Sequence, residues 1–210
     1  MDDQLVDQVR QRRLSHPRSD EADTRLVYKT LHEDKEAFGS IVVSYTPIFY
    51  SLIRHMGIRS QETIEDELQE IFLRIYKALP TFREGRSFFT WSYTIAMNWI
   101  RSQQRKNRAK RTINPIQYDE EMGILQGHRH SDAPEEHIVR SEARRILQAA
   151  LLASKPIYRQ VFVLRMIQGL SVSETAQVLH LPEGTVKTYL FRSREQLRIY
   201  LTEHHWDAKL

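Results

Sequence analysis

Apolar residues recur along this chain at the spacing of an α-helix, and this periodicity constrains the fold more than any other feature of the sequence. The clearest stripe follows the i, i+4, i+7, i+11 pattern and consists of Ile64, Leu68, Ile71, Ile75 and Leu79. The alternation of apolar and polar residues that marks a half-buried β-strand is weak. The sequence therefore predicts an all-α protein.

The helical periodicity stops once in the middle of the chain. Residues 112–136 carry two prolines and two glycines among polar and acidic residues, a composition typical of a linker. Apolar periodicity resumes at Ile138. We therefore expect two small helical domains, at residues 25–111 and 137–210, joined by a flexible acidic linker. The polar residues 1–24 are expected to form a mobile leader.

The composition excludes several classes of protein. The 210 residues include no cysteine, which rules out disulfides, cysteine-based zinc sites and thiolate nucleophiles. No run approaches the roughly 18 apolar residues that a membrane span needs, so we expect a cytoplasmic protein without membrane insertion. No nucleophile or metal constellation is visible, and His128 and His130 fall in the linker, where they are expected to be solvated. We expect no catalytic residue, no cofactor and no metal.

The net charge of +4 conceals an uneven distribution. Between Arg101 and Arg111 the chain carries six cations and no acid, so the rest of the chain is net acidic. Acidic residues gather in one cluster from Glu62 to Glu70 and in another within the linker. Separate blocks of opposite charge indicate separate surfaces for separate partners.

Two helices with a tight turn are predicted near the C-terminus. Ser171 and Glu174 have the spacing of a capping box, which begins a helix, and Pro182 marks the turn after it. A second helix is expected from Glu183, which completes a helix-turn-helix pattern. Four residues of the second helix share its core face: Val186, Leu190, Ser193 and Leu197. The opposite face carries Lys187, Thr188, Phe191, Arg192, Glu195 and Arg198.

This outer face suits a helix that lies in the major groove of DNA. Its cations can pair with phosphates, Thr188 can bond a base edge, and Phe191 can meet a thymine methyl. The same pattern also fits an amphipathic hairpin whose charged face is merely solvated. The aromatic residue on the outer face and the small Ala176 at the helix crossing favour DNA binding.

The helix predicted over residues 64–79 has a second, acidic face. Opposite its apolar stripe stand Asp66, Glu70, Leu73 and Lys77, with Gln69 at the flank. An apolar centre with a polar rim is typical of a protein-docking surface. The alternative is a solvated acidic face with one stray leucine, since single exposed apolar residues are common. A metal site is disfavoured because no histidine or further aspartate completes the set.

The helix predicted from Ser87 to about Arg108 combines aromatic and basic residues. Phe88, Trp91, Ile95 and Trp99 share one face and are expected to form core. A second, polar-to-basic stripe consists of Thr90, Thr94, Asn98, Arg101 and Arg105. Such a cationic track beside aromatics suits single-stranded nucleic acid, and the preceding loop is placed to capture an extruded base. The macrodipole alone would account for one or two of these cations.

Three segments carry a family resemblance. The first is Asp66-Glu67-Leu68-Gln69-Glu70-Ile71-Phe72, in the pattern D-x-x-Q-E-x-F. The second combines Phe82-Arg83 with Phe88-x-x-Trp91-x-Tyr93-x-Ile95-Ala96-x-Asn98. The third contains Gly169-Leu170-Ser171, Glu174, Ala176, Leu179 and Leu181-Pro182-Glu183-Gly184-Thr185-Val186-Lys187. In this order they resemble the group IV, or extracytoplasmic-function (ECF), sigma factors of the sigma-70 superfamily, over residues 25–202.

The resemblance implies a non-enzymatic subunit that binds core RNA polymerase and directs promoter-specific transcription initiation. It implies docking on the polymerase through Asp66, Gln69, Glu70 and Leu73. It implies contact with the melted, single-stranded −10 element through Phe82, Arg83, Arg86, Asn98, Arg101 and Arg105. It implies reading of the duplex −35 element through Thr185, Lys187, Thr188, Phe191 and Arg192. It further implies control by an anti-sigma factor and a linker that threads toward the polymerase active centre.

Two other functions remain open from the residues. A helix-turn-helix transcriptional regulator that is not a polymerase subunit would use the C-terminal domain, but it leaves the acidic face and the basic helix without a role. A nuclease would need a metal or nucleophile site that the sequence does not show. The family also often has an aspartate where this chain has Ser102, so its base preference is not carried over.

Overall fold

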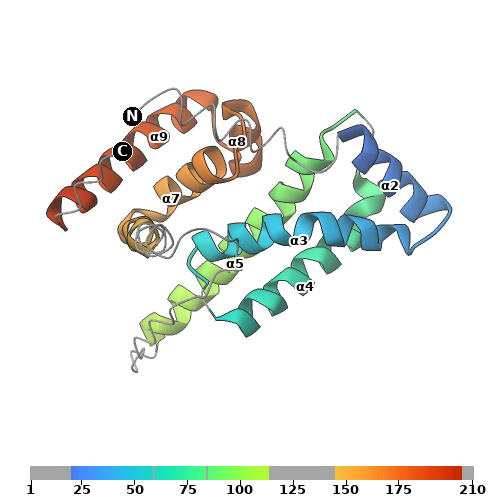
Figure 1. Cartoon of the computed structure of the whole chain (residues 1–210), viewed down its shortest axis with the longest axis horizontal. Coiled ribbons are helices and arrows are strands. Elements are labelled where there is room, and N and C mark those ends of the chain that lie inside the picture. Colours follow the sequence, from blue (N-terminus) through green and yellow to red (C-terminus); the bar gives the residue numbers. More distant parts are fainter. Residues whose placement is uncertain (1–19, 59, 84, 114–144, 205–210) are drawn as a thin grey trace, which may run out of the picture.

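The computed structural model describes residues 20–58, 60–83, 85–113 and 145–204, and every regular element within them is helical (Figure 1). The N-terminal half contains α2 (Asp20–His32), α3 (Ala37–His55), α4 (Gln61–Ala78), the short 3₁₀ turn η1 (Leu79–Thr81) and α5 (Phe88–Ile113). The C-terminal half contains a helical segment at 145–153, α7 (Pro156–Phe162), the π-helical turn η2 (Val163–Ile167), α8 (Val172–Leu179) and α9 (Glu183–Glu203). The predicted all-α class is confirmed.

The N-terminal half is a helical bundle with an aromatic centre. Helix α3 packs against α2 and α4, and α5 packs against both of these as well. The Phe49 ring lies 5.6 Å from the rings of Phe72 and Tyr93, and Tyr45 lies 5.5 Å from Phe88. The apolar stripe predicted for α4 is buried along its whole length: Ile64, Leu68, Ile71, Ile75 and Leu79.

Helix α2 begins inside the stretch that was predicted to be a mobile leader. Residues 20–24 form its first turns, and Asp23 is fully buried where its carboxylate accepts a hydrogen bond of 2.5 Å from the Tyr45 hydroxyl. Asp20 accepts a second bond, of 2.9 Å, from the Ser87 hydroxyl. The prediction of a leader at 1–24 is therefore wrong for its last five residues, because buried polar partners make a polar segment part of the fold. Residues 1–19 lie outside the described part.

The predicted core face of α5 is only partly correct. Phe88 is fully buried, but Trp91, Ile95 and Trp99 are half-buried. The buried set is instead Phe89, Ser92, Tyr93, Ala96, Met97 and Ile100. The reason is that α5 is covered from two directions, by α4 and α2 on one side and by α8 on the other. A single amphipathic stripe does not describe a helix with two partners.

Helix α5 also extends past its predicted end. It continues to Ile113, so Thr112 and Ile113 are helical rather than part of the predicted linker at 112–136. The stretch before them is rich in arginine, lysine and glutamine, which favour helix continuation. The remainder of the predicted linker lies outside the described residues.

The C-terminal half contains the predicted two-helix motif, formed by α8 and α9. The Ser171 side chain accepts the amide of Glu174 at 3.1 Å while the Glu174 carboxylate accepts the amide of Ser171 at 2.7 Å, which is the predicted capping box. Helix α8 ends at His180, whose φ of 55° is left-handed. Helix α9 follows from Pro182 at its N-cap, and it packs against α7 and α8.

The two halves pack against each other through α5 and α8 (Figure 1). Their buried apolar residues form one continuous cluster that runs from Val27 of α2 to Leu197 of α9. None of the helices in the described ranges is long and apolar enough to cross a membrane.

Candidate DNA-binding and polymerase-docking surfaces

The outer face of α9 is open to solvent. Lys187, Thr188 and Arg192 are exposed, Phe191 is 71% exposed, and Thr185 at the helix start is half-buried. The predicted core face is buried through Val186, Ser193 and Leu197, with Leu190 partly buried. The exposed outer face and the buried inner face of α9 that helical spacing predicts are therefore confirmed.

Two of these outward residues are oriented by neighbours. Arg192 donates a hydrogen bond of 3.3 Å from Nη1 to the hydroxyl oxygen of Tyr158 on α7, and this bond raises the pKa of the guanidinium. The Thr188 hydroxyl donates to the carbonyl of Gly184 at 3.0 Å, which leaves its oxygen as an acceptor. Because arginine has five N–H donors, Arg192 retains donors for a partner.

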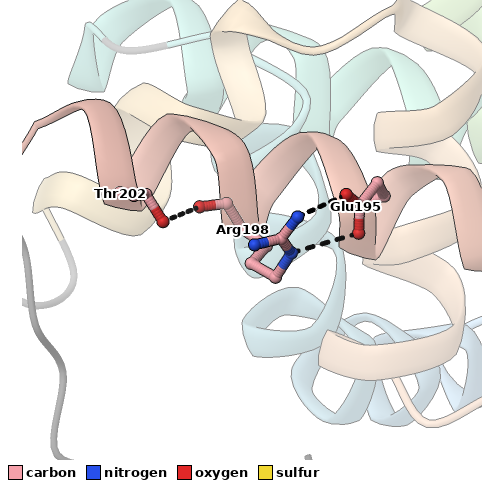
Figure 2. Close-up of polar contacts among 3 residues, drawn as sticks. All are labelled: Glu195, Arg198 and Thr202. Atoms are coloured by element: carbon pink, nitrogen blue, oxygen red, sulfur yellow. Dashed lines mark hydrogen bonds and ion pairs between the residues drawn. The ribbon is translucent and has the colours of Figure 1, made fainter.

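Farther along α9 the outer face carries a charged pair. Figure 2 shows Arg198 bonded twice to the carboxylate of Glu195, from Nε at 3.2 Å and from Nη2 at 2.6 Å. One turn on, the Thr202 hydroxyl donates to the carbonyl of Arg198 at 3.0 Å. The hydrogen bonds lower the pKa of Glu195 and raise that of Arg198. Arg198 is thus already paired, unlike Lys187 at the start of the helix, for which no such pair occurs among the described residues.

The predicted docking face of α4 has an apolar centre and a polar rim. Asp66 and Gln69 are exposed, and Leu73 is 45% exposed. Glu70 is half-buried and forms an ion pair of 2.7 Å with Arg74. The sequence analysis missed Tyr76, an exposed ring three residues after Leu73 whose spacing places it beside that leucine.

A cluster around Trp99 joins this face to α5, and sequence reasoning did not find it. The indole N–H of Trp99 donates a short hydrogen bond to the carboxylate of Glu67. The guanidinium of Arg74 lies 3.9 Å from the Trp99 ring centroid, and the ammonium of Lys106 lies 5.8 Å from it. Burial raises the pKa of Glu67, although its hydrogen bond with Trp99 opposes this.

The loop before α5 presents cations outward and an aromatic ring inward. Arg83 and Arg86 are exposed, whereas Phe82 is half-buried with its ring edge-on to Phe88 at 5.5 Å and to Trp91 at 5.3 Å. Beside Arg86 lies an open pocket of about 590 Å³ whose other lining residues are Asp20, Glu21, Thr24, Arg25, Tyr28 and Gly85. The loop therefore borders a cavity large enough for a nucleotide base.

The polar stripe of α5 is only partly accessible. Asn98 and Arg105 are exposed and Arg101 is half-buried. Thr90 at the start of the stripe is only 5% exposed, because its hydroxyl lies 3.4 Å from the Glu174 carboxylate of α8. The remaining cations of the basic block, Arg108, Lys110 and Arg111, have side chains outside the described residues.

Two family descriptions match the chain, one in each half. "Sigma-70 region 2" matches residues 41–110, and "Sigma-70, region 4" matches residues 144–197. The chain is 33% identical over 172 residues to the ECF RNA polymerase sigma factor SigW of Bacillus subtilis, covering 81% of this chain and 91% of that protein. It is 29% identical over 202 residues to the ECF RNA polymerase sigma-E factor of Escherichia coli K12, covering 94% of this chain and 95% of that protein.

Solved structures share the fold. CnrH in complex with the cytosolic domain of CnrY superposes with a TM-score of 0.63 at 24% identity, covering 87% of this chain and 98% of that one. The sigma factor RpoE in complex with the anti-sigma factor NepR, from Bartonella quintana, gives 0.64 at 19% identity, covering 80% and 98%. Both sigma-70 regions occur in order, and relatives match over most of their length. The chain therefore belongs to the ECF sigma factors, the non-enzymatic subunits that direct RNA polymerase to promoters.

Proposed function

We propose that this sigma factor reads the −35 element with α9, grips the melted −10 strand with the loop before α5 and with α5 itself, and docks on core polymerase with α4. The exposure of Phe191 on α9 is the observation that carries this assignment furthest. The ring stands between the exposed cations Lys187 and Arg192 on one helix face, where it can meet a thymine methyl while the cations bind phosphates. Family membership removes the alternative of a regulator that acts apart from polymerase.

The role of α9 follows from the chemistry of its outer face. Lys187 and Arg192 supply positive charge to either side of Phe191, and Thr188 supplies a polar oxygen. Cations bind phosphates and position a helix, whereas base-edge bonds and apolar contact with a thymine methyl specify sequence. Arg192, held by Tyr158 on its inner side, is the residue best placed for a base contact.

The role of α4 follows from its exposed leucine and tyrosine within an acidic rim. Leu73 and Tyr76 form the apolar centre, and Asp66, Gln69 and Glu70 form the rim. This arrangement fits a protein partner rather than nucleic acid, because carboxylates repel phosphates. Because sigma factors bind core RNA polymerase, core polymerase is the partner that we assign to this face.

The role of α5 and its loop rests on exposed positive charge next to aromatic rings. Arg86 lines the pocket and Arg83 is exposed in the same loop, and Asn98, Arg101 and Arg105 continue along α5. Extruding a base costs a few kcal/mol per unstacked step, which phosphate contacts and capture of the base must offset. We assign this surface to the single-stranded −10 element.

Further parts of the proposal concern regulation and location. An anti-sigma factor that covers these surfaces would silence the protein; the similar solved structures are RpoE in complex with the anti-sigma factor NepR and CnrH in complex with the cytosolic domain of CnrY. Since polymerase and chromosomal DNA are the partners, we place the protein in the cytoplasm.

Leu73→Arg tests the docking surface. A cation in the apolar centre should lower affinity for core polymerase at least tenfold while the helical circular dichroism and thermal midpoint stay unchanged, because Leu73 makes no core contribution. Val43→Arg, at a 75% exposed position on α3, is the matched control and should bind normally. Unchanged polymerase binding by Leu73→Arg would remove the docking assignment.

Arg192→Ala tests the −35 surface. It should cost about 1 to 3 kcal/mol of discrimination at one base pair of the −35 element if the guanidinium bonds a base edge. Arg198→Ala on the same helix is the control, and it should cost less because Glu195 already holds that guanidinium. The measurement is in vitro transcription with core polymerase over a library of −35 sequences. An equal loss on every sequence would show a phosphate contact only.

A further inference from the structure

Arg192 and Arg198 lie on the same outer face of α9 but leave different edges of their guanidinium groups open. The Nε and Nη2 atoms of Arg198 donate to the Glu195 carboxylate at 3.2 and 2.6 Å, so that edge is occupied (Figure 2). Arg192 donates instead from Nη1, at 3.3 Å, to the hydroxyl oxygen of Tyr158 on α7. It makes no other hydrogen bond within the described residues, so its Nε and Nη2 donors remain available.

The edge that Arg192 leaves open is the one that suits a base contact. Nε and Nη2 carry two nearly parallel N–H donors in the plane of the guanidinium. Such a pair can bond two acceptors at once, as the O6 and N7 atoms of guanine offer in the major groove. A bond through Nη1 therefore holds the guanidinium without occupying its Nε–Nη2 edge.

Tyr158 is a firm support for Arg192 because its ring is buried. The side chain is 8% exposed, and its ring lies 5.3 Å from the ring of Tyr189 on α9. The ammonium of Lys155 lies 5.8 Å from the centroid of the same ring. A ring packed in this way stays in one rotamer, so the position of its hydroxyl is fixed.

The start of α7 is itself fastened to α9. Lys155 is the N-cap of α7 and Pro156 follows it, in a position for which proline is preorganised. The backbone amide of Lys155 donates at 3.3 Å to Oε1 of Gln196 on α9. Gln196 lies one turn after Arg192, and Lys155 lies three residues before Tyr158. The two hydrogen bonds therefore join successive turns of the same two helices.

An exposed arginine that binds DNA must be ordered at some point. A long side chain that moves freely in solvent samples many rotamers, and ordering it on binding lowers affinity. The bond to Tyr158 orders the guanidinium of Arg192 before DNA arrives. Because a bidentate bond needs both donors in place, this order favours the matching base pair over the others.

We propose that Tyr158 is a positioning residue for the −35 element: its buried hydroxyl holds Arg192 by Nη1 and so presents the Nε–Nη2 edge to one base pair. Tyr158 acts through Arg192 and not by touching DNA, since its own side chain is buried. The inference rests on the proposed base contact of Arg192. It adds a residue of α7 to a specificity that was assigned to α9 alone.

Tyr158→Phe tests this role because it removes the hydroxyl and keeps the buried ring. The measurement is in vitro transcription with core polymerase over a library of −35 sequences. Discrimination at the base pair read by Arg192 should fall roughly three- to tenfold, which corresponds to the cost of ordering one long side chain. Tyr189→Phe removes the hydroxyl of the neighbouring ring, and this matched control should discriminate as the wild type does. Full discrimination by Tyr158→Phe would overturn the proposal.

Arg192→Ala supplies the background that separates positioning from a role in the fold. In this background Tyr158→Phe should cause no further loss of discrimination, because the hydroxyl has no guanidinium left to hold. A residue that acts only on the fold would lower transcription from every −35 sequence and in both backgrounds. That result would also exclude the positioning role.

A third readout needs neither DNA nor polymerase. In the free protein, the NMR order parameter of Arg192 Nε should be lower in Tyr158→Phe than in the wild type or in Tyr189→Phe. The thermal midpoint of each variant shows whether its fold is kept. An order parameter that does not change in Tyr158→Phe would mean that the bond does not hold the guanidinium, and the proposal would fall.

The same library distinguishes failure of this proposal from failure of the proposed function. If Arg192→Ala loses transcription equally on every −35 sequence, the base contact of Arg192 is wrong and the role of Tyr158 falls with it. If Arg192→Ala loses discrimination at one base pair and Tyr158→Phe does not, the −35 surface stands and only the role of Tyr158 falls.

Discussion

At the scale of single residues, Trp99 connects surfaces that were assigned to different partners. Its indole N–H donates a hydrogen bond to Glu67 on α4, and its ring makes a cation–π contact with the guanidinium of Arg74. Arg74 in turn forms an ion pair with Glu70 on the docking face. A half-buried carboxylate is costly unless it is bonded, and Glu67 obtains its bond only from Trp99 among the described side chains. Trp99 therefore fixes the rotation of α4 against α5.

Two substitutions separate these contributions of Trp99. Trp99→Phe keeps a ring under Arg74 but removes the N–H, and it should lower the free energy of unfolding by about 1 to 3 kcal/mol. Trp99→Leu also removes the cation–π contact and should cost about 0.5 to 1 kcal/mol more. Urea denaturation followed by circular dichroism measures both. Equal losses would mean that the ring contact with Arg74 contributes nothing.

Among residues, the sequence could predict those whose role depends on one helix alone. The outward placement of Phe191 and Arg192 follows from the period of α9, and both are exposed as expected. The bond between Trp99 and Glu67 depends on how α4 and α5 are rotated against each other, which no spacing within one helix determines.

At the scale of elements, the capping box of α8 does more than begin a helix. Ser171 and Glu174 satisfy each other's backbone amides, and the same Glu174 carboxylate reaches Thr90 of α5. The box therefore orients a side chain that takes part in the contact between the two halves. The start of α8 was predictable because the two residues of the box are only three positions apart. Its contact with α5 was not, because Thr90 is far away in the sequence.

Ser171→Ala should destabilise the protein by about 0.5 to 2 kcal/mol, because the amide of Glu174 loses its acceptor at the N-terminus of α8. Ser173→Ala, at an exposed position on the same helix, is the control and should change stability far less. Thermal and urea unfolding measure the difference. Equal effects of the two substitutions would show that the cap contributes nothing beyond loss of a hydroxyl.

Two errors of prediction at this scale share one physical cause. The start of α2 and the faces of α5 are set by partners far away in sequence, namely Tyr45 for Asp23 and Gln168 for Tyr93. A polar residue such as Asp23 is expected at the surface as long as its buried hydrogen-bond partner is not known. The buried faces of α4 and α9 were predicted well because each helix has one apolar stripe, and the spacing of apolar residues within the helix shows where that stripe lies.

At the scale of the whole molecule, the net charge of +4 is the sum of surfaces with opposite sign. The acidic rim of α4 and the cations of α5 and α9 lie on separate helices, so one small protein can present different faces to polymerase and to DNA. Two polar contacts between the two halves lie at the end of α3, where Gln148 donates to the Arg54 carbonyl and Arg159 to the Met56 carbonyl. The half-buried imidazole of His55 lies there as well.

His55 makes the stability of the whole protein depend on pH. Burial lowers its pKa from the usual 6.5, with Arg54 acting in the same direction, and the hydrogen bond of 2.7 Å that its Nδ1 shares with the Ser51 carbonyl opposes the shift only in part. The unfolded chain therefore binds a proton more readily than the folded one. The stabilisation from neutral His55 is complete above pH 6.5 and is lost as the pH falls through the lowered folded pKa.

His55→Gln should remove this part of the pH dependence. The free energy of unfolding of the wild type, measured in urea from pH 7.5 downward, should fall more steeply below about pH 6.5 than that of the variant. Glu67, whose raised pKa makes the folded state lose stability as the pH rises from 4.5, acts in the opposite direction. Because Glu67 is present in both proteins, its effect cancels in the difference between the two curves. Curves that stay parallel from pH 7.5 to 5 would show that His55 titrates alike in the folded and unfolded chains.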